Sequence, residues 1–250
     1  MSTSVKKDTI VQTVGGAILH VQHIKESAVW YSKLLDLPLE DLDDETPFYG
    51  VDMDEGLGLL LDDHRNLKGQ RHPICMLHTN DIQKALSFIN GMGCKISLEL
   101  QNPHPGLAYF NFEDTEGNIL MMCESNWEHP NPKSPKSESH PIKNHINTLV
   151  IPVQNLKRAT EFYSRLLEKP IKPDRQDGGP IYWFDEGILL DDNRNNQDLE
   201  SFPTYMLKAS NIHEAYQYVK NEGIEVVRDI QFDHYFMIKD KEGNTVMVCL

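Results

Sequence analysis

The sequence predicts an α+β fold made of two tandem domains, each built from paired βαβββ modules. Two observations predict it. Four phrases recur in the same order in both halves of the chain, at offsets between 126 and 132 residues, so the chain carries a duplicated unit. Within each half, segments with strand alternation are interleaved with two segments of helical periodicity. This order favours mostly antiparallel sheets with helices on one face.

The repeated phrases are too long and too well ordered for chance. They pair "GLLLDDHRN" (58–66) with "GILLDDNRN" (187–195), "AVWYSKLLDLP" (28–38) with "TEFYSRLLEKP" (160–170), "NDIQKALSFINGMGCKI" (80–96) with "SNIHEAYQYVKNEGIEV" (210–226), and "DTEGN" (114–118) with "DKEGN" (240–244). The small drift in offset is what short loop insertions would produce.

Each half repeats one series of elements: strand, helix and three strands, given twice. In the first half these are strand 16–24, a helix after residue 24, strands 47–53, 56–61 and 74–79, helix 81–91, and strands 95–100, 107–113 and 118–123. The first helix has an apolar face of Trp30, Tyr31, Leu34 and Leu35, mirrored by Phe162, Tyr163, Leu166 and Leu167. The short strands are mirrored by "PIYWF" (180–184) and "GILL" (187–190).

A stretch rich in Pro, Ser and Lys separates the two halves, and this composition is typical of a linker. We therefore expect a first domain at 8–125, a linker at 126–142 and a second domain at 143–250.

Composition limits the partners and the compartment. A net charge of −14 argues against nucleic acid, because phosphate binding needs a basic face. We find neither a signal peptide nor an apolar run long enough to span a membrane, so we expect a cytoplasmic protein with no membrane partner. Cys75, Cys94, Cys123 and Cys249 form no CxxC pair, and we expect them to be reduced.

The order of elements, together with the phrases [F/W]-Y-S-[K/R]-L-L and D-x-E-G-N, resembles the vicinal oxygen chelate superfamily. That group includes glyoxalase-type lyases, extradiol dioxygenases and bleomycin resistance proteins. The resemblance covers the chain apart from its N-terminal tail and linker. It implies two tandem glyoxalase/bleomycin-resistance-like domains. It does not imply one chemistry, because the fold hosts several reactions and also proteins that only bind.

In metal-dependent members, the resemblance implies His, Gln or Glu ligands near the starts of strands one and five and the ends of strands four and eight of each domain. The corresponding residues are Gly16, Leu60, Ile74 and Met121 in the first domain, and Thr148, Leu189, Thr204 and Met247 in the second. None is a usual ligand for such a cation. We therefore expect no metal and no cofactor, and we assign no catalytic residue.

Three other features of the sequence bear on a cation site. His64, His72, His78 and His104 could converge, but their spacings match no zinc motif, so we favour scattered surface histidines. "DDNRNNQD" (191–198) lacks the Gly and Glu of a calcium loop. Asp62 and Asp191 could contact a cation or substrate at the rim of each sheet. We favour turns at strand ends, with Arg65 and Arg194 as possible partners.

Strand alternation places sulfur-containing side chains on the concave face of each sheet. That face would hold Ile18, His20, Met76, His78, Met121 and Cys123 in the first domain, and Val150, Met206, Lys208, Met247 and Cys249 in the second. Three interpretations stay open: an adaptable apolar pocket, a filled core, or a soft Cu(I) site.

The second domain has the more pocket-like surface, because an aromatic run, Tyr182 to Phe184, lies beside its concave face. The expected ligand-binding residues are Thr148, Trp183, Thr204, Met206, His234 and Met247. The predicted function is metal-independent binding of a small molecule, for sequestration or sensing, by a monomer or homodimer. The alternative is a metal-dependent lyase, isomerase or dioxygenase with displaced ligands such as Asp62, His64 or His234. A third possibility is an interaction scaffold in which the concave face of each sheet is closed.

Overall fold

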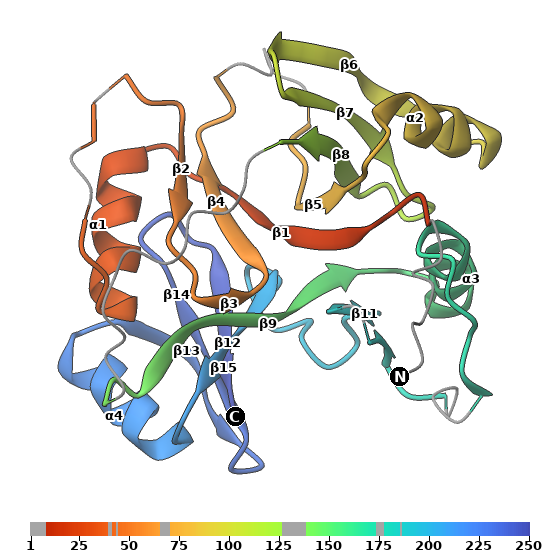
Figure 1. The fold of residues 1–250 in the computed structure, drawn as a ribbon. Helices are drawn as coiled ribbons and strands as arrows, with labels where there is room; N and C mark the ends of the chain where they lie inside the picture. The colour runs from red at the N-terminus through yellow and green to blue at the C-terminus, as the bar shows by residue number, and fades with distance from the viewer. Residues whose placement is uncertain are drawn as a thin grey trace, which may run out of the picture.

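The structure is a computed structural model that describes residues 9–39, 42–43, 45–65, 71–126, 139–173, 178–185 and 187–250. It confirms the α+β fold: two mixed, mostly antiparallel sheets, one per half of the chain, with helices packed against them (Figure 1). Most of the expected linker, 126–142, lies outside the described residues.

The first half contains β1 (Thr13–His20), α1 (Ile24–Leu35), β2 (Phe48–Val51), β3 (Glu55–Gly56), β4 (Gly58–Asp62), β5 (Cys75–His78), α2 (Ile82–Gly91), β6 (Ile96–His104), β7 (Leu107–Glu113) and β8 (Ile119–Ser125). The second contains β9 (Ile142–Pro152), α3 (Leu156–Leu166), β10 (Ile181–Phe184), β11 (Ile188–Asp191), β12 (Tyr205–Ala209), α4 (Ile212–Asn221), β13 (Glu225–Gln231), β14 (Tyr235–Lys239) and β15 (Thr245–Cys249).

Both sheets have the same topology. The first runs β2-β4-β1-β5-β8-β7-β6 and the second β10-β11-β9-β12-β15-β14-β13. In the first sheet the two central strands, β1 and β5, are antiparallel to each other. The strand β1 is flanked by its parallel partner β4, and β5 is flanked by its parallel partner β8. The short β3 of the first half pairs with β9 instead, so it joins the second sheet.

The two faces of each sheet have different roles. Leu59 and Leu61 belong to the main hydrophobic core, whereas Leu60 and Asp62 point to the opposite face, as alternation predicts. The first sheet is curled: Asp62 on β4 lies close enough to Tyr109 on β7, four strands away in the sheet, for its charge to act on the Tyr109 hydroxyl. Burial, and then this charge, raise the pKa of Tyr109. The face opposite the main core is therefore concave.

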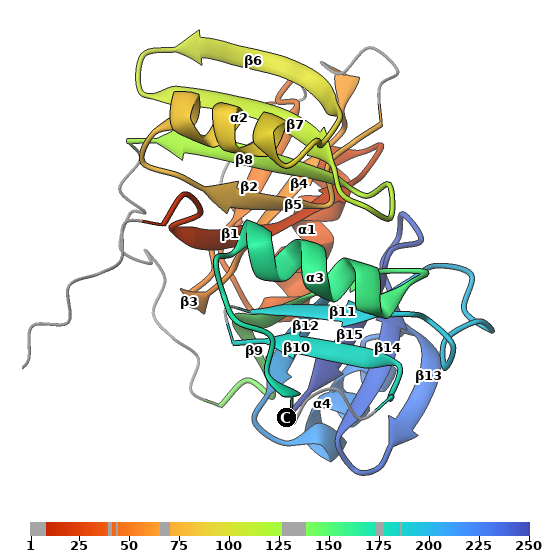
Figure 2. The same ribbon diagram turned by 90° about the vertical axis from the view of Figure 1, so that its right-hand side faces the viewer.

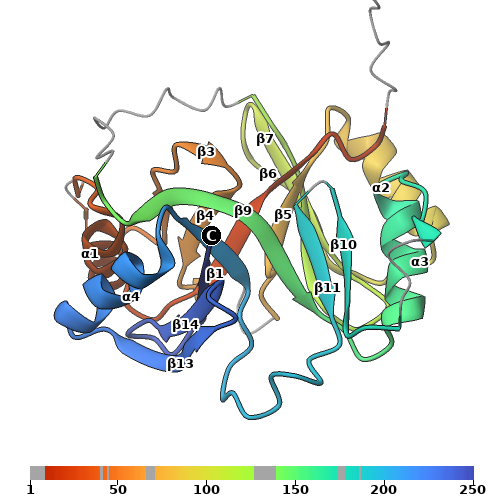
Figure 3. The same cartoon turned by 90° about the horizontal axis from the view of Figure 1, so that it is seen from below.

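The main core is shared by both halves: one cluster of buried side chains includes Tyr31 of α1 and Tyr163 of α3 together with Tyr205 of β12. In Figures 2 and 3, α3 of the second half lies beside the first sheet, and α1 of the first half lies beside α4 and β14. α1 and α3 therefore take part in the core shared by the two sheets, and the concave faces point away from that core.

The repeated D-x-E-G-N turn joins one half to the other. Asp114 accepts a hydrogen bond from Tyr163, and Glu116 accepts from the backbone N–H groups of Gln154 and Asn155 at the start of α3. Asn118 Nδ2 donates to the carbonyl of Pro152 at 2.9 Å. The turn requires a left-handed φ of 84° at Gly117, and glycine adopts this conformation readily.

The second copy of the turn makes the same contacts in reverse. Asp240 accepts from Tyr31, Glu242 accepts from the N–H of His23 just before α1, and Asn244 Nδ2 donates to the carbonyl of His20. The residues of the D-x-E-G-N turns, which identify the repeat in the sequence, thus also form contacts between the two halves. An internal two-fold relationship explains why both copies retain them.

The expectation of unpaired thiols is confirmed: Cys75, Cys94, Cys123 and Cys249 are all free. Among the helices of the described ranges, none combines the length and apolar character of a membrane span.

Candidate functional site

Two of the positions at which the resemblance places metal ligands in the first domain, Gly16 and Met121, lie in one row across its concave face. Gly16 on β1 lies opposite Met76 on β5, and Met76 lies beside Met121 on β8. In the second sheet the same row is Thr148, Met206 and Met247. The other positions lie outside the row: Leu60 pairs with Ile18 and Leu189 with Val150, while Ile74 and Thr204 lie two residues before Met76 and Met206.

These rows do not fit the hard or borderline divalent cation of metal-dependent relatives. Two of the three residues in each row are thioethers, which prefer softer ions. At Gly16 no ligand side chain fits, since a Cβ would lie 2.2 Å from the carbonyl oxygen of Gly58. No reaction step is therefore assigned to a metal at these positions.

The concave face of the second domain is filled. Met206, Met237, Met247 and Cys249 form a second buried cluster with Val150 and Leu189. Leu199 and Phe202, from the segment that follows β11, pack over this cluster.

Thr148 is also buried, and the Oγ1 of Thr204 is buried without a hydrogen-bond partner among the described residues. Four of the six predicted ligand-binding residues therefore lie together, beneath a cover of side chains.

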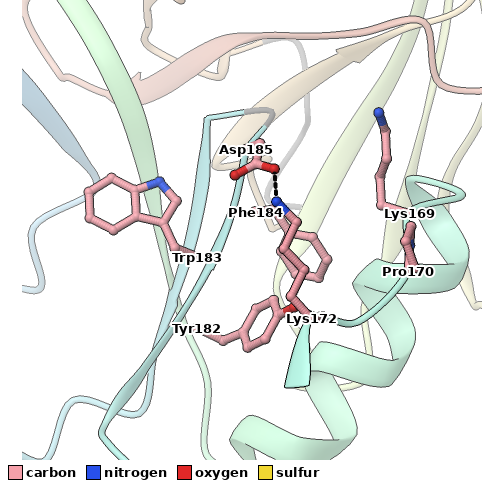
Figure 4. A pocket seen from close by; sticks show the side chains of 7 residues that line it. All are labelled: Lys169, Pro170, Lys172, Tyr182, Trp183, Phe184 and Asp185. Carbon is pink, nitrogen blue, oxygen red and sulfur yellow. Dashed lines mark hydrogen bonds and ion pairs between the residues drawn. The ribbon is translucent and has the colours of Figure 1, made fainter. Parts of the chain in front are cut away.

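The other two predicted residues lie apart from this row. Trp183 is on the edge strand β10, beside Leu189, and is 40% exposed, while Tyr182 and Phe184 point into the core. His234 is exposed in the turn before β14. Trp183 lines a pocket with Lys169, Pro170, Lys172, Tyr182, Phe184 and Asp185. In Figure 4 its ring points away from the Lys172–Asp185 ion pair.

The concave face of the first domain is less tightly filled. Met76 and Met121 are half-buried, whereas their counterparts Met206 and Met247 are buried. Asn111 on β7 lies beside Met121, is 1% exposed, and its Oδ1 has no hydrogen-bond partner in the described part of the chain. The second sheet has an apolar residue, Met237, at this place.

Three histidines meet at one end of this same face. His20 ends β1, His64 follows β4, and His72 precedes β5; their ligand atoms all lie within 4.8 Å of one another. The three ring centroids are 4.7–4.9 Å apart. The expectation of scattered surface histidines is wrong for His64 and His72, because the sheet brings two loops and a strand end to one place.

The environment of two of these rings, His72 and His20, favours their uncharged form. Burial, and then the neighbouring His64 and His20, lower the pKa of His72 to about 4. Burial and His64 also lower the pKa of His20, although the charges of Asp62, Glu242 and Asp63 oppose that shift. At neutral pH, neutral imidazoles offer lone pairs that can bind a cation.

The paired aspartates that end β4 and β11 form turns, as expected. Asp62 Oδ1 accepts from the N–H of His64 at 2.7 Å, and Asp191 Oδ1 accepts from that of Asn193 at 2.7 Å. The arginines pair with the second aspartate of each copy, Asp63 and Asp192, rather than with the first.

Fold and site together define a tandem βαβββ protein with an apolar concave face in each half. A sequence model of the Glyoxalase/Bleomycin resistance protein/Dioxygenase superfamily matches residues 10–122. The first domain belongs to this superfamily, and the second domain repeats its fold. No curated protein matches the sequence.

Solved structures with this fold cover most of the chain. The Mn(II)-bound glyoxalase from Novosphingobium aromaticivorans is 13% identical, with a TM-score of 0.61 over 96% of this chain and 82% of its own. The 2,3-dioxygenase LapB from Pseudomonas sp. KL28 is 12% identical, with a TM-score of 0.62 over 97% and 93%. Homoprotocatechuate 2,3-dioxygenase from Arthrobacter globiformis is 16% identical, with a TM-score of 0.61 over 98% and 81%. At these identities the likeness establishes the fold.

Proposed function

We propose that this protein binds a small organic molecule on the concave face of its first domain, independently of any metal at the positions used by metal-dependent relatives. Binding of this kind would serve sequestration or sensing. The observation that carries the proposal is Asn111, a buried amide with an unpartnered oxygen in the row of Gly16, Met76 and Met121. A buried polar atom without a partner is costly, and a ligand with a hydroxyl or N–H group would satisfy it.

The rest of this face supports the proposal. Its floor is apolar and contains two flexible methionines, Met76 and Met121, which adapt to ligands of varied shape. The neutral hydroxyl of Tyr109 and the carboxylate of Asp62, which lie near each other across the curl, supply polar groups near the apolar floor. An apolar floor with a few polar groups is the usual make-up of a small-molecule site.

The test is a thermal-shift screen of small aromatic and acidic compounds in the presence of EDTA, followed by calorimetry. The set includes catechol and homoprotocatechuate, because a catechol 2,3-dioxygenase and a homoprotocatechuate 2,3-dioxygenase are among the similar structures. We expect Asn111→Met, which installs the residue of the second repeat, to weaken binding by about tenfold, the equivalent of one hydrogen bond. A screen without binders, or binding unchanged by Asn111→Met, contradicts the proposal.

The second domain is retained as an alternative location for the ligand, through Thr148, Trp183, Thr204, Met206, His234 and Met247. Its cover of Leu199 and Phe202 would first have to open. Trp183→Ala and Met247→Glu test this location in the same assay. Loss of binding in these variants, with Asn111→Met unchanged, would move the site to the second domain.

A metal-dependent lyase, isomerase or dioxygenase is a second candidate function, and the group of His20, His64 and His72 favours it. Ligand binding that EDTA abolishes would support this candidate over metal-independent binding. We further propose a cytoplasmic location and a monomer or homodimer, with the monomer favoured because the duplication places two sheets in one chain. Fractionation and light scattering test these points.

A further inference from the structure

We propose that His20, His64 and His72 bind a borderline divalent cation of the zinc type, at a position distinct from the rows of methionines. The site lies at the rim of the first concave face, where β1 and β4 end and β5 begins. It does not rest on the proposed function, since a cation there would leave Asn111 and the apolar floor unchanged.

The first argument is the geometry of the donors. Each histidine offers one ring nitrogen, and these atoms lie within 4.8 Å of one another. Zinc–nitrogen bonds are about 2.0–2.1 Å long, so an ion at the centre would draw each nitrogen inward by less than roughly 1 Å. Rotation of the side chains is enough for that movement.

The second argument is that the nitrogens lack other partners. The side chain of His64 is 6% exposed, and its Nε2 has no hydrogen-bond partner among the described residues. Its Nδ1 lies 3.2 Å from Asp62 Oδ2, without the alignment of a hydrogen bond. His20 Nδ1 is also buried without a partner within the described ranges. Buried polar atoms of this kind point to a missing ion, ligand or water.

The third argument comes from the second repeat. The positions of His20, His64 and His72 hold Pro152, Asn193 and Phe202 there, so all three imidazoles are present in one repeat and absent from the other. His64 has a left-handed φ of 55°, and Asn193 has the same conformation with φ 60°. Asparagine adopts this conformation routinely. A buried histidine at this strained position suggests a function for its ring.

The chemistry of the donors selects the class of ion. Three imidazoles suit Zn²⁺, Ni²⁺, Fe²⁺ or Cu²⁺ and disfavour Ca²⁺ and Mg²⁺. Asp62 lies beside His64 and would orient its ring, with Nδ1 toward the carboxylate and Nε2 toward the ion. Three protein ligands leave a fourth position open for water or a ligand from the concave face.

The experiment uses the full chain, stripped with EDTA and dialysed. Titration with Co²⁺ is followed by visible absorption, Zn²⁺ is used in competition, and the bound zinc is counted by elemental analysis. We expect one equivalent of zinc. We expect His64→Asn and His72→Phe, which install the residues of the second repeat, each to weaken binding more than about 100-fold, since even a changed neighbour of a ligand costs 10–100-fold.

Two controls keep the outcome clear. His104→Ala removes an exposed histidine of β6 and should leave metal affinity unchanged. The side chain of His72 lies at the protein surface, with part of its ring covered by His20 and His64, so His72→Phe should fold even if His64→Asn does not. Failure of the wild-type chain to bind one equivalent, or equal affinity in the wild type and His72→Phe, overturns the site. Asn111→Met should still bind one equivalent of metal. Failure of the metal site and failure of the proposed ligand site can therefore be told apart.

Discussion

The hydroxyl of Tyr31 donates a hydrogen bond of 3.0 Å to the carboxylate of Asp240, a residue of the other repeat. Tyr163 donates the matching bond of 2.8 Å to Asp114. All four side chains are buried, so each carboxylate depends on its tyrosine and on the donors of its own turn. The two halves are therefore held together by the residues that mark the duplication.

Removal of either tyrosine hydroxyl should destabilise the chain. We expect Tyr31→Phe and Tyr163→Phe each to lower the free energy of unfolding by about 1–3 kcal/mol, because a buried carboxylate loses a donor. Urea unfolding followed by circular dichroism measures the effect. Tyr216→Phe is the control, since its partner Asp229 is exposed. A loss in the control as large as in the two buried variants would contradict the importance of the interdomain contact.

The stability contributed by Glu116 should depend on pH. Burial raises the pKa of this carboxyl, but hydrogen bonds from Arg158 and from the N–H groups of Gln154 and Asn155 outweigh burial and lower it. Because the folded pKa lies below the ordinary value of 4.5, the contribution is present above pH 4.5 and is lost as the pH falls.

We therefore expect Glu116→Gln to be less stable than the wild type at pH 7 and to approach it as the pH falls below 4.5. Urea unfolding at several pH values gives the difference. Glu99→Gln, at an exposed position, serves as the reference. A difference between wild type and Glu116→Gln that is constant with pH would rule out the charge as its origin.

The buried amide oxygen of Asn111, which has no hydrogen-bond partner among the described residues, should reduce stability in the absence of ligand. We expect Asn111→Met to raise the free energy of unfolding by about 1 kcal/mol, because a buried polar group without a partner is replaced by an apolar one. The same variant should bind ligand less well. Thermal unfolding without ligand is the measurement, and a decrease in stability would indicate that Asn111 is already satisfied in the free protein.

Phe202 should act as part of the cover over the second concave face. Phe202→Ala removes a half-buried ring that packs against Met206 and its neighbours, and we expect a loss of about 1–2 kcal/mol, less than for a fully buried Phe. It should also increase the fluorescence of anilinonaphthalene sulfonate. Phe232→Ala changes a ring that is 89% exposed and should do neither. Unchanged fluorescence in Phe202→Ala would show that the face stays filled.

Much of the fold follows from local patterns. The alternation of Leu59, Leu60 and Leu61 fixes which side chains face the core, because a strand has only two faces. The duplicated phrases predict two domains of equal topology. The apolar rows of methionines also follow from alternation, and the sheet register shows that Met76 and Met206, rather than Ile74 and Thr204, lie in them.

The candidate sites were harder to predict, because they depend on which segments meet. Asn111 reads as an ordinary polar residue in a strand, and only the curled sheet shows that its oxygen is buried without a partner. The filling of the second concave face depends on Leu199 and Phe202, which return from a loop. One signal was present in the sequence: His64 replaces the asparagine of an otherwise repeated turn.

By itself, the sequence determined the duplication, the order of elements and the face of the sheet on which each strand side chain lies. These features depend on periodicities of two and 3.6 residues. The tertiary structure decided that His20, His64 and His72 meet and that each D-x-E-G-N turn contacts the other half. Such contacts join residues far apart in the chain, and only the pairing and curl of the sheets determine which of them meet.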